Sequence, residues 1–375
     1  MDVQQPLTLL GGLSPAQFMR RYWHKKPLLA RQAVPGFKPP VGRARLLALA
    51  AREGVESRFI QYRDGQWLLR HGPLARHSLP SFATRRWSVL VQGVDLHDEA
   101  VHALLQQFRF VPQARLDDLM ISYASDGGGV GPHFDSYDVF LLQAHGRRRW
   151  RIGRQKNAAL IEGLPLKILR SFEPEQEMLL EPGDMLYLPP GWAHDGVAEG
   201  ECMTYSVGFR SPSGADLARE ILPRLADAAA EEDDSPIYRD PRQGAVTASG
   251  EIPAALQAFA RQAVRHALAG PQALERALGE TLTEPKPNVW FEPSGPSGAS
   301  GRMERVTLDR RTRMMYDARH VYINGESYRA TGRDAALMRR LADQRCLQAR
   351  DLARASAEAR ELLAAWREAG WAHGQ

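Results

Sequence analysis

The chain has 375 residues, a length that favours two or three domains over a single core. Hydrophobic residues make up 43% and charged residues 25%, as in globular proteins and unlike disordered chains. No apolar run approaches the roughly 18 residues of a transmembrane helix, and the first residues lack a signal-peptide pattern, so we expect a cytoplasmic protein without a membrane partner. Cysteine occurs only at Cys202 and Cys346, which excludes a disulfide framework and a cysteine zinc site.

Charge is distributed unevenly along the chain. Residues 1–210 carry 26 Lys/Arg and 21 Asp/Glu, residues 211–295 carry 8 and 13, and residues 296–375 carry 15 and 10. Basic regions can indicate an anionic partner such as nucleic acid. However, 43 of the 49 basic residues are Arg, as a GC-rich genome would produce, so the charge is only weak support for such a partner.

The first elements in chain order are two helices, followed by many strands. Ser14 and Pro15 predict a helix start, and a second helix is expected over 43–53, ending at Gly54. Asp64-Gly65 predicts a hairpin turn, and a helix is expected near 97–108. Short strands separated by Gly/Pro turns are typical of a β-sandwich or barrel. The strands predicted from Trp87 onward are 87–92, 118–123, 139–143, 149–152, 177–180, 185–188 and 203–209.

Beyond residue 211 the apolar spacing becomes helical. The series Leu217/Ile221/Leu225 and Leu274/Leu278/Leu282 are expected to be helix-packing stripes. Residues 292–301 read as a Ser/Gly/Pro-rich linker, and Asn324-Gly325 predicts a hairpin, followed by helices over 334–344 and 347–369. We therefore expect three domains, covering residues 1–210, 211–295 and 296–375.

One group of residues has the composition of a metal site. His133 and Asp135 lie two positions apart, so on a strand they would face the same way, and His194 follows Pro189-Pro190-Gly191-Trp192-Ala193. Two imidazoles and one carboxylate on one octahedral face leave three open positions, the geometry of non-haem Fe(II) oxygenases. A His-x-Asp pair alone is a weak signal, but Gly127-Gly128-Gly129 before it would allow close backbone approach.

Arg148 is a candidate ligand for an anionic co-substrate. If side chains alternate along the predicted strand, Arg148 shares a face with Trp150 and Ile152, whereas Arg147 and Arg149 point to the other face. An arginine among apolar neighbours needs a buried anion, and its planar fork suits the far carboxylate of a dicarboxylic 2-oxo acid.

Three stretches resemble the bacterial ribosomal oxygenases, a family of JmjC/cupin-type protein hydroxylases that depend on Fe(II) and 2-oxoglutarate. They are residues 18–29 (FMRRYWHKKPLL), residues 118–150 around GPHFDSYDVFLLQ and GRRRW, and residues 186–194 (LYLPPGWAH). The resemblance implies an α+β protein with a double-stranded β-helix core, a helical dimerisation segment and a winged-helix-like C-terminal domain. It also implies a homodimer.

The resemblance assigns a role to each candidate residue. His133, Asp135 and His194 would bind Fe(II), Arg148 would hold 2-oxoglutarate, and Ser122 would assist Arg148. The family's bacterial members hydroxylate an arginine side chain of a large-subunit (50S) ribosomal protein, with O₂ consumed and succinate and CO₂ released. Histidine-directed relatives in animals tend to carry Lys in the co-substrate position, which Arg148 does not match.

An arginine substrate would need a carboxylate for its guanidinium and an aromatic wall for its plane. Tyr137, two residues past Asp135, is expected to line the substrate groove. Asp126 is the first choice for the acid, and Asp138 is a second acid nearby. The competing interpretation of Tyr137 is a barrel aromatic packed beneath the ligands.

Two functions from other classes remain open. One is a metal-dependent cupin enzyme that does not use 2-oxoglutarate, for which no succinate would form. The other is a non-catalytic adaptor whose C-terminal domain binds nucleic acid. Direct nucleic-acid binding is not favoured, because Arg339-Arg340, Arg345 and Arg350 fall on amphipathic helices where solvated arginines are common.

Overall fold

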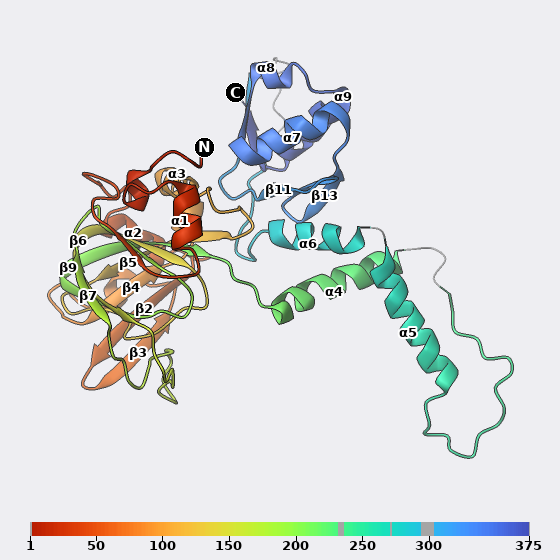
Figure 1. Ribbon diagram of the computed structural model, residues 1–375, viewed down its shortest axis with the longest axis horizontal. Helices are drawn as coiled ribbons and strands as arrows, with labels where there is room; N and C mark the ends of the chain where they lie inside the picture. The colour runs from red at the N-terminus through yellow and green to blue at the C-terminus, as the bar shows by residue number, and fades with distance from the viewer. Residues whose placement is uncertain (1, 232–235, 271, 294–303, 375) are drawn as a thin grey trace. The chain divides into compact units, whose positions relative to one another are not determined.

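The computed structural model describes residues 2–231, 236–270, 272–293 and 304–374. It divides the chain into two compact units, Met1–Ser211 and Pro212–Gln375 (Figure 1). The expected boundary at 295/296 and most of the expected linker lie outside the described residues. Within the described ranges, no helix combines the length and the apolar character needed to cross a membrane.

The N-terminal unit is built on one antiparallel sheet in the strand order β1-β8-β6-β9-β5-β4-β2-β3, with β7 paired to β6. The sheet bends around a core that includes Phe59, Trp87, Tyr123 and Phe140. Its elements are η1 (Thr8–Leu10), α1 (Pro15–Arg21), β1 (Leu28–Ala30), α2 (Arg43–Ala50), β2 (Ser57–Arg63), β3 (Gln66–His71), η2 (Arg76–Ser78), β4 (Trp87–Val91), η3 (Val94–Leu96), α3 (Glu99–Gln106), β5 (Leu116–Ala124), β6 (Val139–Gly153), β7 (Gln176–Leu180), β8 (Met185–Leu188) and β9 (Ala193–Phe209).

Two local predictions for this unit are confirmed. The Ser14 side chain accepts from the Gln17 amide in a capping box, with Pro15 at the first helical position of α1. The hairpin at Asp64-Gly65 joins β2 and β3, with Arg63 opposite Gln66 and both turn residues at positive φ.

The two longest strands, β6 and β9, correct the predicted strand series. The segments 139–143 and 149–152 form one strand, and 203–209 is only the last part of β9. The β6–β9 register shifts between Gln143 and Arg147, and Gly146 has a φ of 61° there. A Cβ on Gly146 would lie 2.1 Å from the Glu201 carbonyl oxygen, so this bend requires glycine. The strands therefore bend without ending and pair with different neighbours on either side.

In the described ranges, the C-terminal unit contains three helices, two small sheets and three further helices. Its elements are α4 (Gly214–Ala230), α5 (Ala254–Ala269), α6 (Ala273–Thr283), β10 (Arg305–Leu308), β11 (Met314–Tyr316), β12 (His320–Ile323), β13 (Glu326–Arg329), α7 (Gly332–Gln344), β14 (Cys346–Gln348), α8 (Ala349–Leu352), α9 (Ala357–Glu368) and β15 (Ala372–Gly374). The sheets have the orders β14-β10-β15 and β11-β12-β13. Leu341, Leu363 and Trp366 belong to its core.

The predicted hairpin at Asn324-Gly325 is confirmed, because Ile323 pairs with Glu326 across it. The single helix expected over 347–369 is wrong. Leu347 is fully buried in β14, opposite Val306 of β10, and the rest of the segment forms two separate helices, the short α8 and then α9, where the Ser356 side chain accepts from the Ala359 amide. Apolar spacing does not distinguish a buried strand residue from the start of a helix.

Helix α6 packs on the β11–β12–β13 sheet. Its Gly279 lies beneath the Tyr322 ring, since a Cβ there would be 2.4 Å from ring carbons. The Tyr322 hydroxyl donates to the Glu275 carbonyl at 3.2 Å. The last helix of the expected dimerisation segment is thus packed on the sheet of the C-terminal residues.

Candidate metal centre

The three predicted metal ligands converge on one point. The ligand atoms of His133, Asp135 and His194 all lie within 4.8 Å of one another. The two imidazole centroids are 4.3 Å apart, and His194 Nε2 is 3.7 Å from an Asp135 carboxylate oxygen. Among the described residues, this is the only group of three or more such side chains that meets this spacing.

The backbone route to this arrangement differs from the expected one. His133 and Asp135 lie in the segment before β6 and not within a strand. His133 and His194 form an isolated antiparallel bridge, in which each amide donates to the other's carbonyl at 3.0 and 2.7 Å. This pair, not strand alternation, brings the two imidazoles together.

Both histidines are oriented for metal binding through Nε2. His133 Nδ1 lies 2.8 Å from the Gly131 carbonyl and His194 Nδ1 lies 3.0 Å from the Trp192 carbonyl. Because a carbonyl oxygen only accepts, Nδ1 must carry the proton in each ring, leaving the Nε2 lone pair available. Such backbone contacts fix tautomer and orientation in metal-binding histidines.

The electrostatics of the site favour a neutral His194. Burial, followed by the effect of the neighbouring His133 and Arg148, lowers the pKa of His194 to about 3. Burial raises the pKa of the Asp135 carboxyl, while His133, Tyr137 and Arg58 oppose that shift. A divalent cation would stabilise the ionised form of the buried Asp135 carboxyl. The two imidazoles and this carboxylate therefore fit a metal ion.

Arg148 lies on the inner face, as predicted. It is 4% exposed, and its guanidinium carbon is 5.2 Å from the Trp150 ring centre. Its Nη1 donates to the hydroxyls of Ser122 (3.2 Å) and Thr204 (3.1 Å), whereas its Nε has no hydrogen-bond partner. No carboxylate forms a salt bridge with Arg148 in the part of the chain that the structure describes. A buried, incompletely satisfied cation beside the triad fits an anionic co-substrate.

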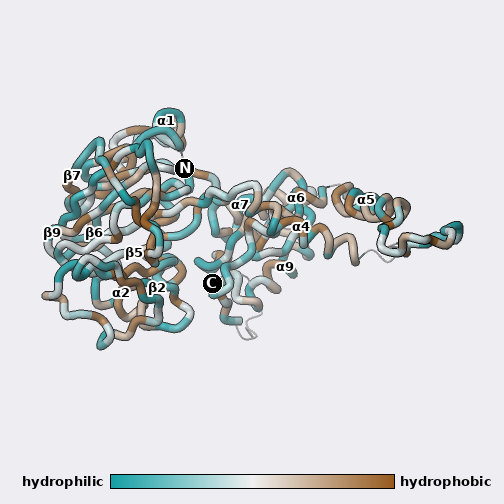
Figure 2. The backbone as a smooth tube through the Cα atoms, turned by 90° about the horizontal axis from the view of Figure 1, so that it is seen from below, coloured by the Kyte–Doolittle hydropathy of each residue, from teal (hydrophilic) through white to brown (hydrophobic). Residues whose placement is uncertain are grey.

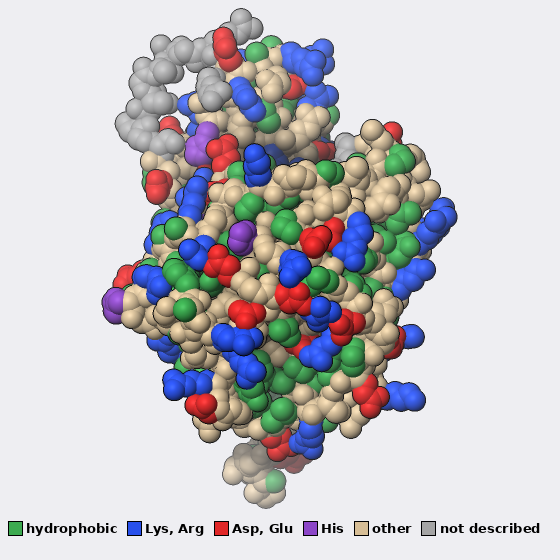
Figure 3. Space-filling model, turned by 90° about the vertical axis from the view of Figure 1, so that its left-hand side faces the viewer, with side chains coloured by type: hydrophobic (Ala, Val, Ile, Leu, Met, Phe, Trp, Pro, Cys, Tyr) green, Lys and Arg blue, Asp and Glu red, His purple; other side chains and the backbone are tan. Residues whose placement is uncertain are grey.

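The neighbouring arginines confirm the face assignment. Arg147, Arg149 and Arg151 point outward and meet acids of the adjacent strands, including Glu199 and Asp195. On the face of the N-terminal unit presented in Figure 3, blue and red side chains are interspersed and do not form one basic patch.

Sequence reasoning missed two residues near Arg148, namely Thr204 and Gln143. Thr204 on β9 lies opposite Ser122 of β5, and its hydroxyl donates to the Gln143 side chain at 3.1 Å. The alternating positions of Cys202, Thr204 and Ser206 indicate that these side chains share one face of the strand. Alternation does not show which of them lies opposite Ser122, because that depends on the register of the two strands.

The glycine run before His133 makes the close backbone approach expected of it. A Cβ on Gly129 would lie 2.5 Å from the Gly196 carbonyl oxygen of β9. The contact holds the segment leading to His133 against the strand that carries His194.

Asp126 does not lie where the substrate hypothesis needs it. Its carboxylate accepts from the Gly200 amide at 2.9 Å and forms a 2.7 Å salt bridge with Arg85. Gly200 is six residues along β9 from His194, roughly 20 Å at strand spacing. Asp138 is also unavailable, because it is fully buried and its carboxylate contacts Tyr187, His24 and Arg115.

Tyr137, in contrast, is placed beside the triad. Its hydroxyl forms a hydrogen bond with Asp135, and its side chain is 39% exposed, which contradicts the interpretation of a packed barrel aromatic. Burial of the hydroxyl end, followed by the Asp135 charge, raises the pKa of Tyr137, and Arg58 and Asp118 are also close enough to act on it. Arg58 and Asp118 were not predicted; both contact the Gln92 side chain, Arg58 at 3.4 Å and Asp118 at 2.8 Å.

The bent antiparallel sheet and the His/Asp/His triad define a JmjC/cupin-type protein. The JmjC domain family matches residues 103–217, and the ROXA-like winged-helix family matches residues 262–373. The crystal structure of E. coli ycfD superposes with a TM-score of 0.82 at 30% identity, covering 96% of this chain and 98% of that chain. A second structure, described as YcfD, a ribosomal oxygenase from Escherichia coli, matches with a TM-score of 0.79 at 30% identity over 97% of this chain and 98% of that chain. The chain belongs to the bacterial ribosomal oxygenases.

Two curated bacterial relatives agree with this assignment. The chain is 41% identical over 213 residues to "Ribosomal protein uL16 3-hydroxylase" of E. coli, covering 56% of this chain and 55% of the relative. It is 38% identical over 210 residues to "Probable ribosomal oxygenase" of Haemophilus influenzae, covering 55% and 52%. The chain thus spans about half the length of these curated relatives in the alignments. A further E. coli YcfD structure, a complex with cobalt and 2-oxoglutarate, matches with a TM-score of 0.78 at 29% identity over 96% of this chain and 98% of that chain.

Proposed function

We propose that this protein is an Fe(II)- and 2-oxoglutarate-dependent dioxygenase that hydroxylates an arginine side chain of a 50S ribosomal protein. The observation that carries the proposal is the combination of the His133/Asp135/His194 triad with a buried Arg148 that has no acidic partner among the described residues. The similarity to a uL16 3-hydroxylase and to a protein that binds cobalt and 2-oxoglutarate supports the same function.

His133, Asp135 and His194 would hold Fe(II), and Arg148, with Ser122 and Thr204, would hold the distal carboxylate of 2-oxoglutarate. Together, the two groups would supply oxidation of an unactivated C–H bond by O₂, with succinate and CO₂ as co-products. The chain's own residues would bind and orient the metal ion and 2-oxoglutarate. The two Nδ1–carbonyl contacts fix the imidazoles, and the buried wall of Trp150 and Arg148 excludes water from the co-substrate side.

For the substrate, Tyr137 remains our candidate for the aromatic wall, because it is partly exposed and touches Asp135. The guanidinium is not assigned to Asp126, because its carboxylate is engaged by Gly200 and Arg85. Asp118 also acts on the pKa of Tyr137, but we do not assign the guanidinium to it, because it is 2% exposed and its carboxylate accepts from the Gln92 side chain and the Gly93 amide. A ribosomal substrate supports a cytoplasmic location.

We also propose a homodimer formed through α4 and α5. Helix α5 has no buried residue, and brown, apolar segments lie along it in Figure 2. The exposed fractions are 53% for Leu222 of α4, and 61% and 50% for Val264 and Leu268 of α5. Exposed apolar side chains on two consecutive helices are typical of an interface.

The decisive experiment supplies the protein with Fe(II), 2-oxoglutarate and O₂ and measures succinate with and without arginine-containing ribosomal peptides. We expect peptide-stimulated succinate, and an arginine heavier by one oxygen atom in the peptide and in ribosomes from cells that carry the gene. His133→Ala should lose both signals. Turnover without succinate would favour a cupin enzyme of another kind, and RNA binding that survives in His133→Ala, without turnover, would favour the adaptor.

A further inference from the structure

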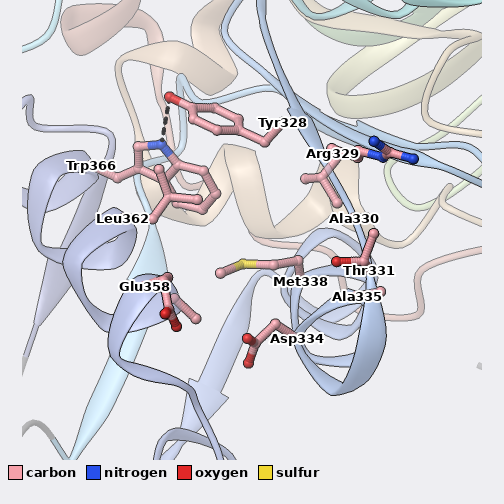
Figure 4. Close-up of a pocket in the computed structure, with 12 residues that line it drawn as sticks. Tyr328, Arg329, Ala330, Thr331, Asp334, Ala335, Met338, Glu358, Leu362 and Trp366 are labelled. Carbon is pink, nitrogen blue, oxygen red and sulfur yellow. Dashed lines mark hydrogen bonds between the residues drawn. The ribbon is translucent and has the colours of Figure 1, made fainter.

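The C-terminal unit contains a cavity of about 340 Å³ that the oxygenase chemistry does not use. It lies between the β12–β13 hairpin, α7 and α9 (Figure 4). The residues that line it are Val321, Tyr328, Arg329, Ala330, Thr331, Asp334, Ala335, Met338, Glu358, Ala359, Leu362 and Trp366.

One part of the cavity is apolar. Met338 and Trp366 are buried, Leu362 is half-buried, and Trp366 Nε1 donates to the Tyr328 hydroxyl at 3.4 Å. In Figure 4 the Trp366, Tyr328 and Leu362 side chains gather at one end, with Met338 between them and the acids. A methionine with aromatic neighbours forms an adaptable surface for an aliphatic chain.

The other part carries two carboxylates, Asp334 in the first turn of α7 and Glu358 in the first turn of α9. Hydrogen bonds to Ser356 lower the pKa of Asp334, and a backbone hydrogen bond lowers the pKa of Glu358, so both are charged at neutral pH. Arg333 is near both acids, but neither acid forms a salt bridge with any residue that the structure describes. Figure 4 shows the Arg329 guanidinium directed away from them.

A cavity with an apolar half and two carboxylates that form no salt bridge among the described residues fits a side chain that combines a long aliphatic stem with a cation. We propose that it binds an arginine or lysine of a basic protein segment, with the stem on Met338 and Leu362 and the cation at Asp334 and Glu358. The same carboxylates repel phosphate, which disfavours nucleic acid at this position. That the segment belongs to the ribosomal protein substrate rests on the proposed function.

The test measures binding of a short fluorescein-labelled peptide of Arg and Leu to the full-length protein by fluorescence anisotropy. The Asp334→Asn/Glu358→Gln variant should bind this peptide about fivefold more weakly, the effect of two partly exposed charge pairs. The matched control is Glu361→Gln/Glu368→Gln, which removes two exposed acids of α9 outside the cavity and should bind like the wild type. A peptide with Glu in place of Arg should not bind.

His133→Ala separates this inference from the proposed function, because it should bind the peptide normally while losing turnover. Equal affinity of the wild type and the Asp334→Asn/Glu358→Gln variant would overturn the inference, whatever the turnover. If the peptide binds as expected but no ribosomal protein is hydroxylated, the cavity stands and the oxygenase proposal fails. With a full-length ribosomal substrate, the double variant should raise KM without changing kcat.

Discussion

Arg148 is a buried cation whose hydrogen bonds reach only hydroxyl groups, Ser122 and Thr204. Replacing it with Ala should raise the KM for 2-oxoglutarate roughly 10- to 100-fold, because a charge-assisted pair contributes about 1.5–3 kcal/mol. Steady-state kinetics at varied 2-oxoglutarate measures this. Arg147→Ala is the control, since the Arg147 side chain is 55% exposed and its salt bridge with Glu199 is long, at 3.8 Å. Loss of metal affinity in Arg148→Ala would show that Arg148 supports the triad itself.

Substitution of a triad residue should remove activity without unfolding the protein. We expect His133→Ala, Asp135→Ala and His194→Ala each to abolish turnover and weaken Co(II) binding, measured by absorbance titration. The far-UV circular dichroism should not change, because the contact between the two segments is made by the main-chain atoms of His133 and His194, which alanine keeps. Wild-type succinate production by His194→Ala would contradict the ligand assignment.

Tyr137 and Asp126 now carry opposite predictions. Tyr137→Ala should raise the KM for an arginine peptide and leave peptide-independent succinate formation in place, because the ring is exposed beside Asp135. Asp126→Ala should leave the peptide KM unchanged, since its carboxylate holds Gly200 and Arg85. Peptide kinetics of both variants decide the point: an effect of Asp126→Ala alone would reverse our placement of the substrate.

At the scale of elements, the site depends on the contact between the glycine-rich segment before His133 and β9. Gly129→Ala would bring a Cβ to 2.5 Å from the Gly196 carbonyl, a backbone atom that cannot rotate away. We expect the free energy of unfolding to fall by about 1–3 kcal/mol and the affinity for Co(II) to weaken. Thermal unfolding measures the first quantity and Co(II) titration the second. Gly214→Ala in α4, with nothing within 4 Å, should be neutral or slightly stabilising.

The same elements explain which parts of the site could be predicted. Arg148 was placed by strand alternation alone, because Arg148, Trp150 and Ile152 all lie beyond the register shift in β6, where the pairing is regular. Thr204 was missed, because its partnership with Ser122 depends on the pairing of β9 with β5, a long-range register. Asp126 was misplaced because proximity in sequence to His133 is not proximity in space when a turn separates them. That His133, Asp135 and His194 come together was predicted from residue type and family resemblance, although the backbone bridge that joins the two histidines could not be foreseen.

At the scale of the whole molecule, the exposed stripe of α5 makes the oligomeric state testable. Val264→Glu should weaken the proposed dimer, because it places a charge on a 61% exposed apolar position. Gln262→Glu adds the same charge on the opposite side of the helix and should not affect assembly. Sedimentation velocity over a range of concentrations provides the measurement, and a wild-type protein that is monomeric throughout would refute the dimer.

The backbone bridge between His133 and His194 bears on how the protein discriminates among metals. The two imidazoles are held 4.3 Å apart by main-chain hydrogen bonds, so the site is assembled before any ion arrives. Loading and loss of iron then require no refolding, and an empty chain can be refilled. Because the site is preassembled, folding cannot select one metal ion over another. Two imidazoles with one carboxylate bind Co²⁺, Ni²⁺ or Cu²⁺ more tightly than Fe²⁺. Correct loading must therefore follow the supply of metal in the cell, and excess cobalt or nickel should inactivate the protein by substitution while leaving its structure intact.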